Sequence, residues 1–339
     1  MKIREYGITI GHLPTGVHNC ITDVEGVAVG HETIREDLED GEVIRTGVTA
    51  ILPHDGNLFR EKVIGASHVI NGFGKTAGLV QVDELGTIES PIMLTNTLAV
   101  GTVLQSTVKE MLTQSPEIGD TTGTVNVVVG ECNDGHLNTI RHIAVREEHV
   151  QRALQNASTT RAEEGAVGAG TGMVCFGHKG GIGSSSRCTD HYTVGVLVLS
   201  NFGKEHDFEY ARYKGRHTEE AIAETDGSII IVLATDAPVT QRQLKRIIQR
   251  CSIGLGKTGA YFSNGSGDIT IGFSTAHRIP HQSDEKIALH VLRDDEEEMY
   301  QLFKAAAEAT EEAILNSLAQ AETTTGRKGR IVKAYPFRK

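Results

Sequence analysis

The chain has 339 residues and a formal net charge of −11, with 39% hydrophobic residues, 38 glycines and no tryptophan. This is the composition of a folded globular protein, and a length of about 150 residues per domain allows one large domain or two. The acidic balance excludes a nucleic-acid-binding surface, which needs a basic footprint. No run approaches the roughly 18 apolar residues that predict a membrane-spanning helix.

The amino terminus and the cysteines predict a cytoplasmic protein. No apolar segment follows the charged residues of the first turn, so we expect no signal peptide and no membrane partner. An odd number of cysteines in a long chain favours reduced thiols over a disulfide framework. The five are Cys20, Cys132, Cys175, Cys188 and Cys251.

Short β-branched runs alternate with helical patterns along the chain. In order, they predict a strand at 48–52, a helix near 97–113, a strand at 124–130, a helix near 144–157, strands at 193–199 and 228–234, and helices near 240–252 and 295–320. The runs at 193–199 and 228–234 are continuously apolar, which is typical of strands buried on both faces. No linker or repeat divides the sequence, so we expect one layered domain over residues 1–339. The basic segment from Thr323 to Lys339 is predicted to be a solvated tail.

Glycine is concentrated in two stretches, with ten glycines in residues 165–203 and six in residues 254–272. Such clusters mark backbone that turns sharply or approaches another group closely. The second stretch begins with a G-x-G-x-x-G pattern at Gly254–Gly259. A dinucleotide site would need this pattern after a strand, whereas here it follows a predicted helix. We therefore interpret it as a helix end followed by a loop.

A zinc site is one alternative for the first stretch. Cys175 and His178, followed by Cys188 and His191, are soft ligands at a plausible spacing. Against zinc, Cys175 lies in a strand-like run, and the Gly-rich segment 179–184 between the two pairs is typical of a substrate-binding loop. We therefore predict no metal, and elemental analysis would decide between the two hypotheses.

Asp226, Gly227 and Ser228 lead directly into the buried strand at 228–234. A Gly-Ser pair at a strand entrance is most often a turn. It also suits self-cleavage, because the Ser228 hydroxyl can attack the carbonyl of Gly227, which carries no side chain. Cleavage would make Ser228 a new amino terminus, whose α-amine has a reference pKa of about 7.7–8.0. That amine could act as the base that a serine nucleophile needs.

Three more polar residues are candidates for catalysis. Ser266 and Asp268 are two residues apart, so their side chains lie on one side of an extended segment. Asn201 follows the apolar run at 193–199 and could donate a side-chain N–H to an oxyanion. Each of these residues alone is more often found in a turn than in a catalytic site.

A series of short motifs runs in order through nearly the whole chain: Leu13–Gly16, Ile21–Val27, Asn71–Gly74, Gly130–Gly135, Gly168–Met173, Lys179–Gly183, Asn201–Gly203, Asp226–Ile230, Ala234–Pro238 and Gly265–Asp268. With them the sequence resembles the DmpA-like aminopeptidases, the family of L-aminopeptidase/D-Ala-esterase/amidases and β-peptidyl aminopeptidases. So many ordered matches are more specific than any single motif.

The resemblance implies an α/β fold, an αββα sandwich shared with ornithine acetyltransferase, in which two β-sheets pack between helical layers. It implies autoproteolysis between Gly227 and Ser228 into chains of residues 1–227 and 228–339. It also implies a homotetramer and a reaction that requires no metal or other cofactor.

The resemblance assigns a role to each candidate residue. Ser228 is the nucleophile, and Ser266 and Asp268 supply the assisting hydroxyl and acid. Asn201 belongs to the oxyanion hole. Glu131 binds the free amine of the substrate.

Asn133 departs from the family pattern, because well-known members have a tyrosine at this place. Asparagine can still donate an N–H but is much shorter. We therefore expect Asn133 to line a wider substrate pocket, or one in which a water fills the gap. The substrate preference of those members is not carried over to this chain.

The predicted function is that of an N-terminal-nucleophile hydrolase. It would release N-terminal residues from small peptides, amides or esters with a free amine, through an acyl-enzyme on Ser228. Two alternatives remain besides zinc. One is an acyltransferase of the ornithine acetyltransferase type, which usually has a threonine nucleophile and is therefore disfavoured by Ser228. The other is an inactive homologue that binds a small molecule.

Overall fold

Two β-sheets lie at the centre of the computed structural model, which describes residues 1–39, 41–213, 215, 222, 227–283, 286–295 and 297–337. The smaller sheet has the strand order β1 (Ala28–Asp37), β2 (Val43–Leu52), β5 (Ile92–Asn96) and β6 (Val128–Cys132). The larger sheet has the order β4 (Thr87–Ile88), β3 (Glu61–Gly72), β12 (Gly267–Pro280), β11 (Ser228–Thr235), β10 (Thr193–Asn201) and β9 (Gly181–Cys188). Strands β11 and β12 run parallel, whereas β10 and β3 run antiparallel to them.

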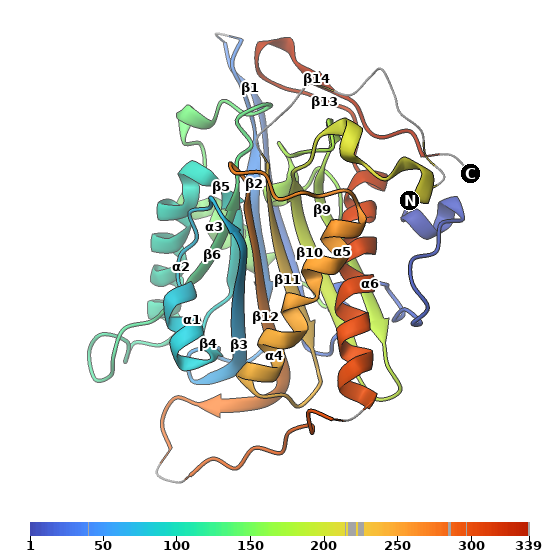
Figure 1. Ribbon diagram of the computed structural model, residues 1–339. Coiled ribbons are helices and arrows are strands. Elements are labelled where there is room, and N and C mark those ends of the chain that lie inside the picture. The colour runs from blue at the N-terminus through green and yellow to red at the C-terminus, as the bar shows by residue number, and fades with distance from the viewer. Residues whose placement is uncertain are drawn as a thin grey trace.

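Helices cover the outer face of each sheet (Figure 1). Helices α2 (Val100–Gln114) and α3 (Glu147–Gln155) pack on the smaller sheet. Helices α4 (Gln241–Gln249) and α6 (Glu297–Ala319) pack on the larger one, and α5 (Cys251–Lys257) packs on α6. The short helix α1 (Leu79–Leu85) lies against β3. These four layers confirm the predicted αββα sandwich.

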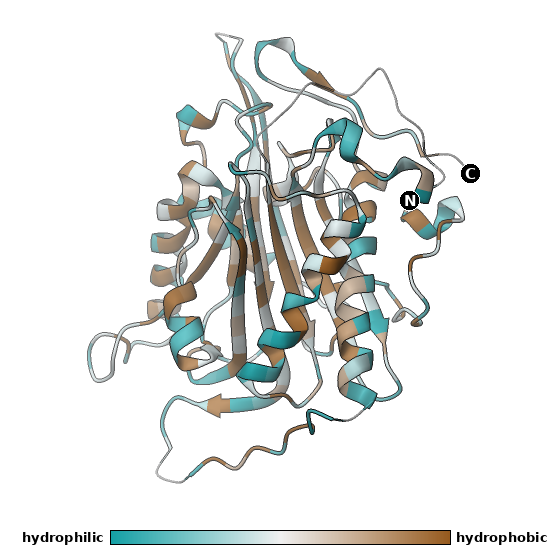
Figure 2. Ribbon diagram, in the orientation of Figure 1, coloured by the Kyte–Doolittle hydropathy of each residue, from teal (hydrophilic) through white to brown (hydrophobic). Residues whose placement is uncertain are grey.

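Strand β11 shows why the two sheets and the helices stay together. Ile230, Val232 and Ala234 pack into the core between the sheets. Ile229, Ile231 and Leu233 point the other way, into the core beneath the helices. Side chains alternate across a strand, so a strand between two apolar layers must be apolar at every position. The central strands are accordingly hydrophobic along their length in Figure 2, which confirms the prediction from the continuous apolar runs.

The predicted helices and strands are confirmed, with shifted ends. The strand expected at 124–130 is β6, which begins only at Val128. The helix expected near 240–252 divides into α4 and α5 at Arg250. The longer strands β1, β3, β5, β9 and β12 were not predicted, and β9 includes part of the segment 179–184 that was expected to be a substrate-binding loop. No helix in the described ranges is both long and apolar enough to cross a lipid bilayer.

The carboxyl-terminal segment corrects one prediction, because it is not a free solvated tail. Strands β13 (Thr324–Thr325) and β14 (Ile331–Val332) pair with each other, and the Lys179 amide donates to the Lys333 carbonyl over 2.9 Å. Val332 and Tyr335 are buried, and the Tyr335 ring lies against Phe208. The prediction was based on the basic residues of this segment. It did not consider the apolar side chains between them, which dock on the rest of the protein.

The residues of the two motif alternatives lie on or next to identified strands and helices. Cys175 lies in β7 (Val174–Cys175) and His178 in β8 (His178–Lys179), whereas Cys188 ends β9 and His191 follows it. In the part of the chain that the structure describes, no group of three or more His, Cys, Asp or Glu side chains could hold a metal ion. The Gly254–Gly259 pattern covers the end of α5, which confirms the helix-end interpretation.

Candidate active site

The candidate residues meet where the parallel strands β11 and β12 begin. Ser228 opens β11, and its backbone pairs with Asn201 at the end of β10 on one side and with Gly267 at the start of β12 on the other. Strand β3 ends beside them, with Gly72 opposite Gly267. Because antiparallel neighbours end where the parallel pair begins, four strands bring their polar ends to one edge of the larger sheet.

Ser228 is buried, and its Oγ accepts a hydrogen bond of 3.1 Å from the Gly267 amide. The position before it, that of Gly227, has no space for a side chain. A Cβ on Gly227 would lie 2.5 Å from the Asn201 carbonyl oxygen and closer still to the Phe202 Cα. The Gly227–Ser228 peptide bond is therefore packed against the carboxyl end of β10. Asp226, the first residue of the predicted motif, lies outside the described residues.

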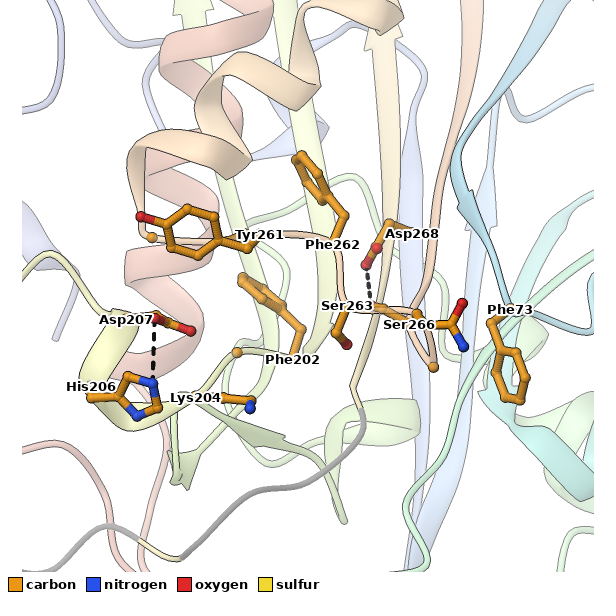
Figure 3. Close-up of a pocket in the computed structure, with 15 residues that line it drawn as sticks. Phe73, Phe202, Lys204, His206, Asp207, Tyr261, Phe262, Ser263, Ser266 and Asp268 are labelled. Carbon is orange, nitrogen blue, oxygen red and sulfur yellow. Dashed lines mark hydrogen bonds and ion pairs between the residues drawn. The ribbon is translucent and has the colours of Figure 1, made fainter.

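Ser266 and Asp268 form the predicted pair, with a hydrogen bond of 2.7 Å from the Ser266 Oγ to the Asp268 Oδ1 (Figure 3). Asp268 is only 2% exposed, and its Oδ2 has no hydrogen-bond partner among the described residues. Burial raises the pKa of Asp268 to about 6, although the hydrogen bond from Ser266 opposes the shift. A carboxyl group with a pKa near neutrality can exchange protons at working pH.

Both the oxygen and the nitrogen of the Asn201 side-chain amide make hydrogen bonds, which fix its orientation. Its Oδ1 accepts from the Val174 amide over 2.9 Å, and its Nδ2 donates to the Asn133 carbonyl over 3.0 Å. An Nδ2 group has two hydrogens, so one remains for another acceptor. Asn201 is also the backbone partner of Ser228. A donor held in place beside a nucleophile can stabilise an oxyanion.

Glu131 reaches the same place from the smaller sheet, where it lies in β6. Its Oε1 accepts from the Lys75 amide over 2.9 Å, and its Oε2 accepts from the Thr97 hydroxyl. A Cβ on Gly74 would lie 3.9 Å from the Glu131 Oε1 and 3.6 Å from the Gly267 Cα, so Gly74 bridges the two sheets here. Glu131 is buried, and it has no ion-pair partner within the described ranges.

Asn133 contacts the site through its backbone. Its carbonyl accepts from Asn201, whereas its exposed side chain accepts from the Gly135 amide over 2.9 Å in a local turn. Next to it, burial raises the pKa of Asp134 to about 7, and the Asn138 amide donates to Asp134 over 2.9 Å. Asp134 lies in the Gly130–Gly135 motif, but no sequence pattern gave it a role.

A cavity of about 810 Å³ opens beside Ser266 and Asp268. Its wall is rich in aromatic rings, although only 5% of the chain is aromatic. In Figure 3 these rings come from three segments, after β3, after β10 and after α5; they are Phe73, Phe202, Tyr261 and Phe262. Sequence reasoning missed them, because no local pattern indicates that three separate loops meet. Thr97 was missed because strand β5 before it was not predicted.

The model of peptidase family S58 matches residues 19–332 of the chain. The chain belongs to peptidase family S58. It is 38% identical to the β-peptidyl aminopeptidase BapA of Sphingosinicella microcystinivorans, in an alignment that covers 99% of this chain and 89% of that protein.

Solved structures agree with this membership. A protein of Pyrococcus horikoshii OT3 is 48% identical with a TM-score of 0.91, over 99% of this chain and 96% of that one. The L-aminopeptidase D-Ala-esterase/amidase of Ochrobactrum anthropi is 36% identical with a TM-score of 0.91, over 99% and 96%. The latter is described as a prototype for the serine aminopeptidases and a variant of the Ntn hydrolase fold.

These likenesses confirm the predicted family, and this S58 chain is a serine-type aminopeptidase of the N-terminal-nucleophile class. The acyltransferase alternative is not favoured, since the relatives of known activity are aminopeptidases.

Proposed function

We propose that this S58 chain becomes active by cleaving its own Gly227–Ser228 bond, and that Ser228 then carries an acyl-enzyme. One observation supports this above all: Ser228, Asn201 and the Ser266–Asp268 pair meet at one edge of the larger sheet. These groups supply a nucleophile, an oxyanion donor and a proton acceptor.

Self-cleavage begins with attack of the Ser228 Oγ on the Gly227 carbonyl. The C–N bond breaks, the amine of Ser228 takes up a proton, and Gly227 is left as an ester on the Ser228 oxygen. Water then hydrolyses the ester and leaves a carboxylate on Gly227 and a free hydroxyl on Ser228. The products are chains of residues 1–227 and 228–339.

Glu131 is proposed to select substrates by their free amine. Its buried carboxylate accepts hydrogen bonds from a backbone amide and a hydroxyl, neither of which neutralises its charge. A substrate ammonium would do so through a charge-assisted hydrogen bond. This requirement restricts the substrates to small peptides, amides and esters with a free N-terminal amine. Asn133 is proposed to line the substrate pocket beside it.

Turnover is proposed to follow the same chemistry as self-cleavage. The Ser228 Oγ attacks the carbonyl of the first residue, and its proton passes to the α-amine of Ser228 or to the Ser266–Asp268 pair. Asn201 donates its remaining amide hydrogen to the oxyanion. The amine of the leaving group is protonated and departs, and water releases the residue from Ser228.

Mass spectrometry and turnover assays test this proposal together. Wild-type protein should yield two fragments, residues 1–227 and 228–339, because the chain is cut after Gly227. The Ser228→Ala variant should remain one uncut chain and be inactive. Ser252→Ala, a serine of the outer helix α5, should be processed and active like the wild type. Aminoacyl p-nitroanilides and β-alanyl amides are suitable substrates. A wild-type chain that stays whole yet hydrolyses them would overturn the proposal.

Assembly and compartment are inferred from the family resemblance and the thiols. We infer a homotetramer, which light scattering would report as four times the 36.5 kDa of one chain. The five cysteines are free, and four of them are buried. That state fits the reducing cytoplasm. A monomer in dilute solution would contradict the inferred assembly.

A further inference from the structure

Lys179 is a buried lysine with no carboxylate at ion-pair distance among the described residues. Burial lowers the pKa of its amine to about 7, and only the ammonium form has three N–H groups to donate. Its side chain is 0% exposed and lies at the end of β8. The Nζ donates to three backbone carbonyls, those of Gly170 over 3.0 Å, Met173 over 2.9 Å and Gly180 over 2.9 Å. Burying an ammonium is costly even when it is hydrogen-bonded, so this position calls for an explanation.

One of the three carbonyls, that of Met173, leads to Asn201. Met173 and Val174 share one peptide group, whose oxygen accepts from Lys179 and whose N–H donates to the Asn201 Oδ1 over 2.9 Å. The Asn201 Oδ1 and Nδ2 belong to one side-chain amide. Two amide groups in series therefore connect the buried ammonium to the N–H that is available beside Ser228.

The loop geometry keeps this connection in place. The β7–β8 turn reverses the chain with positive φ angles of 49° at Phe176 and 73° at Gly177. It returns Gly180 to Met173, whose oxygen accepts a second hydrogen bond of 3.0 Å from the Gly180 amide. A Cβ on Gly180 would lie 2.6 Å from the Ser200 carbonyl oxygen. The glycines of this stretch thus allow the lysine to approach the backbone behind Asn201.

We propose that Lys179 is a positioning residue of the oxyanion hole, which holds and polarises the Asn201 amide through the Met173–Val174 peptide group. A carbonyl that accepts from a cation loses electron density, so the N–H of the same amide becomes a stronger donor. Chains of hydrogen bonds reinforce one another in this way in a low dielectric. The inference rests on the proposed role of Asn201 as the oxyanion donor.

The first test compares two buried lysines. Losing an oxyanion donor lowers kcat by about 100-fold to 1,000-fold, and cooperative strengthening is a fraction of one bond. Lys179→Met should therefore lower kcat by about tenfold and leave KM unchanged, since Glu131 still binds the amine. Lys2 is the matched control, because its buried Nζ also binds a backbone carbonyl, that of Ser184 over 2.8 Å. Its partners Asn19, Ser184 and Glu164 make no hydrogen bond to Asn201, so Lys2→Met should keep kcat.

A double-mutant cycle separates this inference from the proposed function. Asn201→Ala should lower kcat strongly, and Lys179→Met should then lower it no further, because the amide that transmits its effect is gone. If the fold-decreases in kcat of the two single variants multiply in the double variant, Lys179 does not act through Asn201. The role of Asn201 as oxyanion donor would still stand. If Asn201→Ala leaves kcat unchanged, the proposed oxyanion donor itself is wrong. All rates are referred to the processed fraction, measured by intact mass.

A spectroscopic measurement covers variants that fail to process. In protein labelled with ¹⁵N-asparagine, the side-chain amide signals lost in Asn201→Ala identify this residue. Lys179→Met should move them upfield, because a weaker donor deshields its proton less. Lys2→Met should leave them in place. Unchanged signals in Lys179→Met would overturn the proposal without any measurement of turnover.

Discussion

At the scale of single residues, burial gives ordinary side chains unusual chemistry. Asp268 is buried and accepts a hydrogen bond from Ser266, and burial raises the pKa of Asp268 to about 6. A carboxylate with a raised pKa is a stronger base than an exposed one. In the proposed mechanism, the deprotonated form accepts the proton of the Ser228 hydroxyl through Ser266.

This gives a prediction for the pH dependence of kcat/KM. Below about pH 6 Asp268 is protonated and cannot accept a proton, so kcat/KM should rise as the pH increases through that value. Asp268→Asn should lower kcat by about 100-fold to 10,000-fold and remove this rise. A rate profile from about pH 4.5 to about pH 9 spans the pKa values of both candidate proton acceptors and reports the midpoint.

The control for this profile is Asp236→Asn. Burial also raises the pKa of Asp236, but its carboxylate accepts from the Thr193 amide at the far end of β10 and β11. The rise near pH 6 should therefore persist in that variant. If the wild-type midpoint instead lies at about 7.7–8.0, the α-amine of Ser228 is the proton acceptor and not Asp268.

At the scale of elements, close backbone contact holds the helical layer together. Helix α5 crosses α6 at Gly254, where a Cβ would lie 2.8 Å from the Glu311 nitrogen and closer still to the Ala307 oxygen. Gly256, two residues later in the same helix, has nothing within 4 Å of its Cβ position. Two glycines of one short helix thus have opposite environments.

Alanine at these two glycines should therefore have opposite effects on stability. Gly254→Ala should lower the free energy of unfolding by about 1–3 kcal/mol, because the two helices must separate. Gly256→Ala should raise it by about 0.5–1 kcal/mol, because alanine loses less backbone entropy in a helix. Urea unfolding in the Ser228→Ala background, which keeps one continuous chain, measures both. Equal effects at both positions would contradict this account of α5–α6 packing.

At the scale of the whole molecule, buried ion pairs connect the amino-terminal part of the chain to α6. Arg187 binds Glu312 over 2.6 Å and Glu308 over 3.3 Å, and Arg4 binds Glu312 over 2.8 Å. Although burial opposes it, these arginines lower the pKa of Glu312 below its usual value. The arginines lie before Ser228 and the glutamates after it. After the proposed cleavage, these contacts would hold the two chains together.

Removing one partner should therefore weaken the whole fold. Arg187→Met removes the ion-pair partner of buried Glu308 and leaves Glu312 with Arg4, so it should lower the free energy of unfolding by about 3–5 kcal/mol. Arg293→Met is the control, because Arg293 pairs with Asp295 at the surface, where both side chains are more than two-thirds exposed. Its effect should stay within about 0.5 kcal/mol. Far-UV circular dichroism during urea titration measures both, since the chain has no tryptophan. A small effect of Arg187→Met would show that the pair contributes little.

The sequence by itself determined the layered fold and the central strands, because apolar periodicity is a local property. The runs at 193–199 and 228–234 are typical of strands between two apolar layers, and they form β10 and β11. The order of the motifs identified the family, and with it Ser228, Ser266, Asp268, Asn201 and Glu131 as candidates. For the same reason the prediction failed where a contact is distant in sequence, as for the carboxyl-terminal ladder that docks on Lys179.

The tertiary structure alone decided which groups act on one another. The parallel pairing of β11 with β12 places Ser228 beside Gly267, and the turn after β7 places Lys179 behind Asn201. The tertiary structure also shows that the Asn133 side chain accepts a hydrogen bond within its own turn. It brings aromatic residues from three loops together at one cavity. Burial depends on neighbours from distant segments, so the raised pKa of Asp268 and the buried charge of Lys179 have no signature in the local sequence.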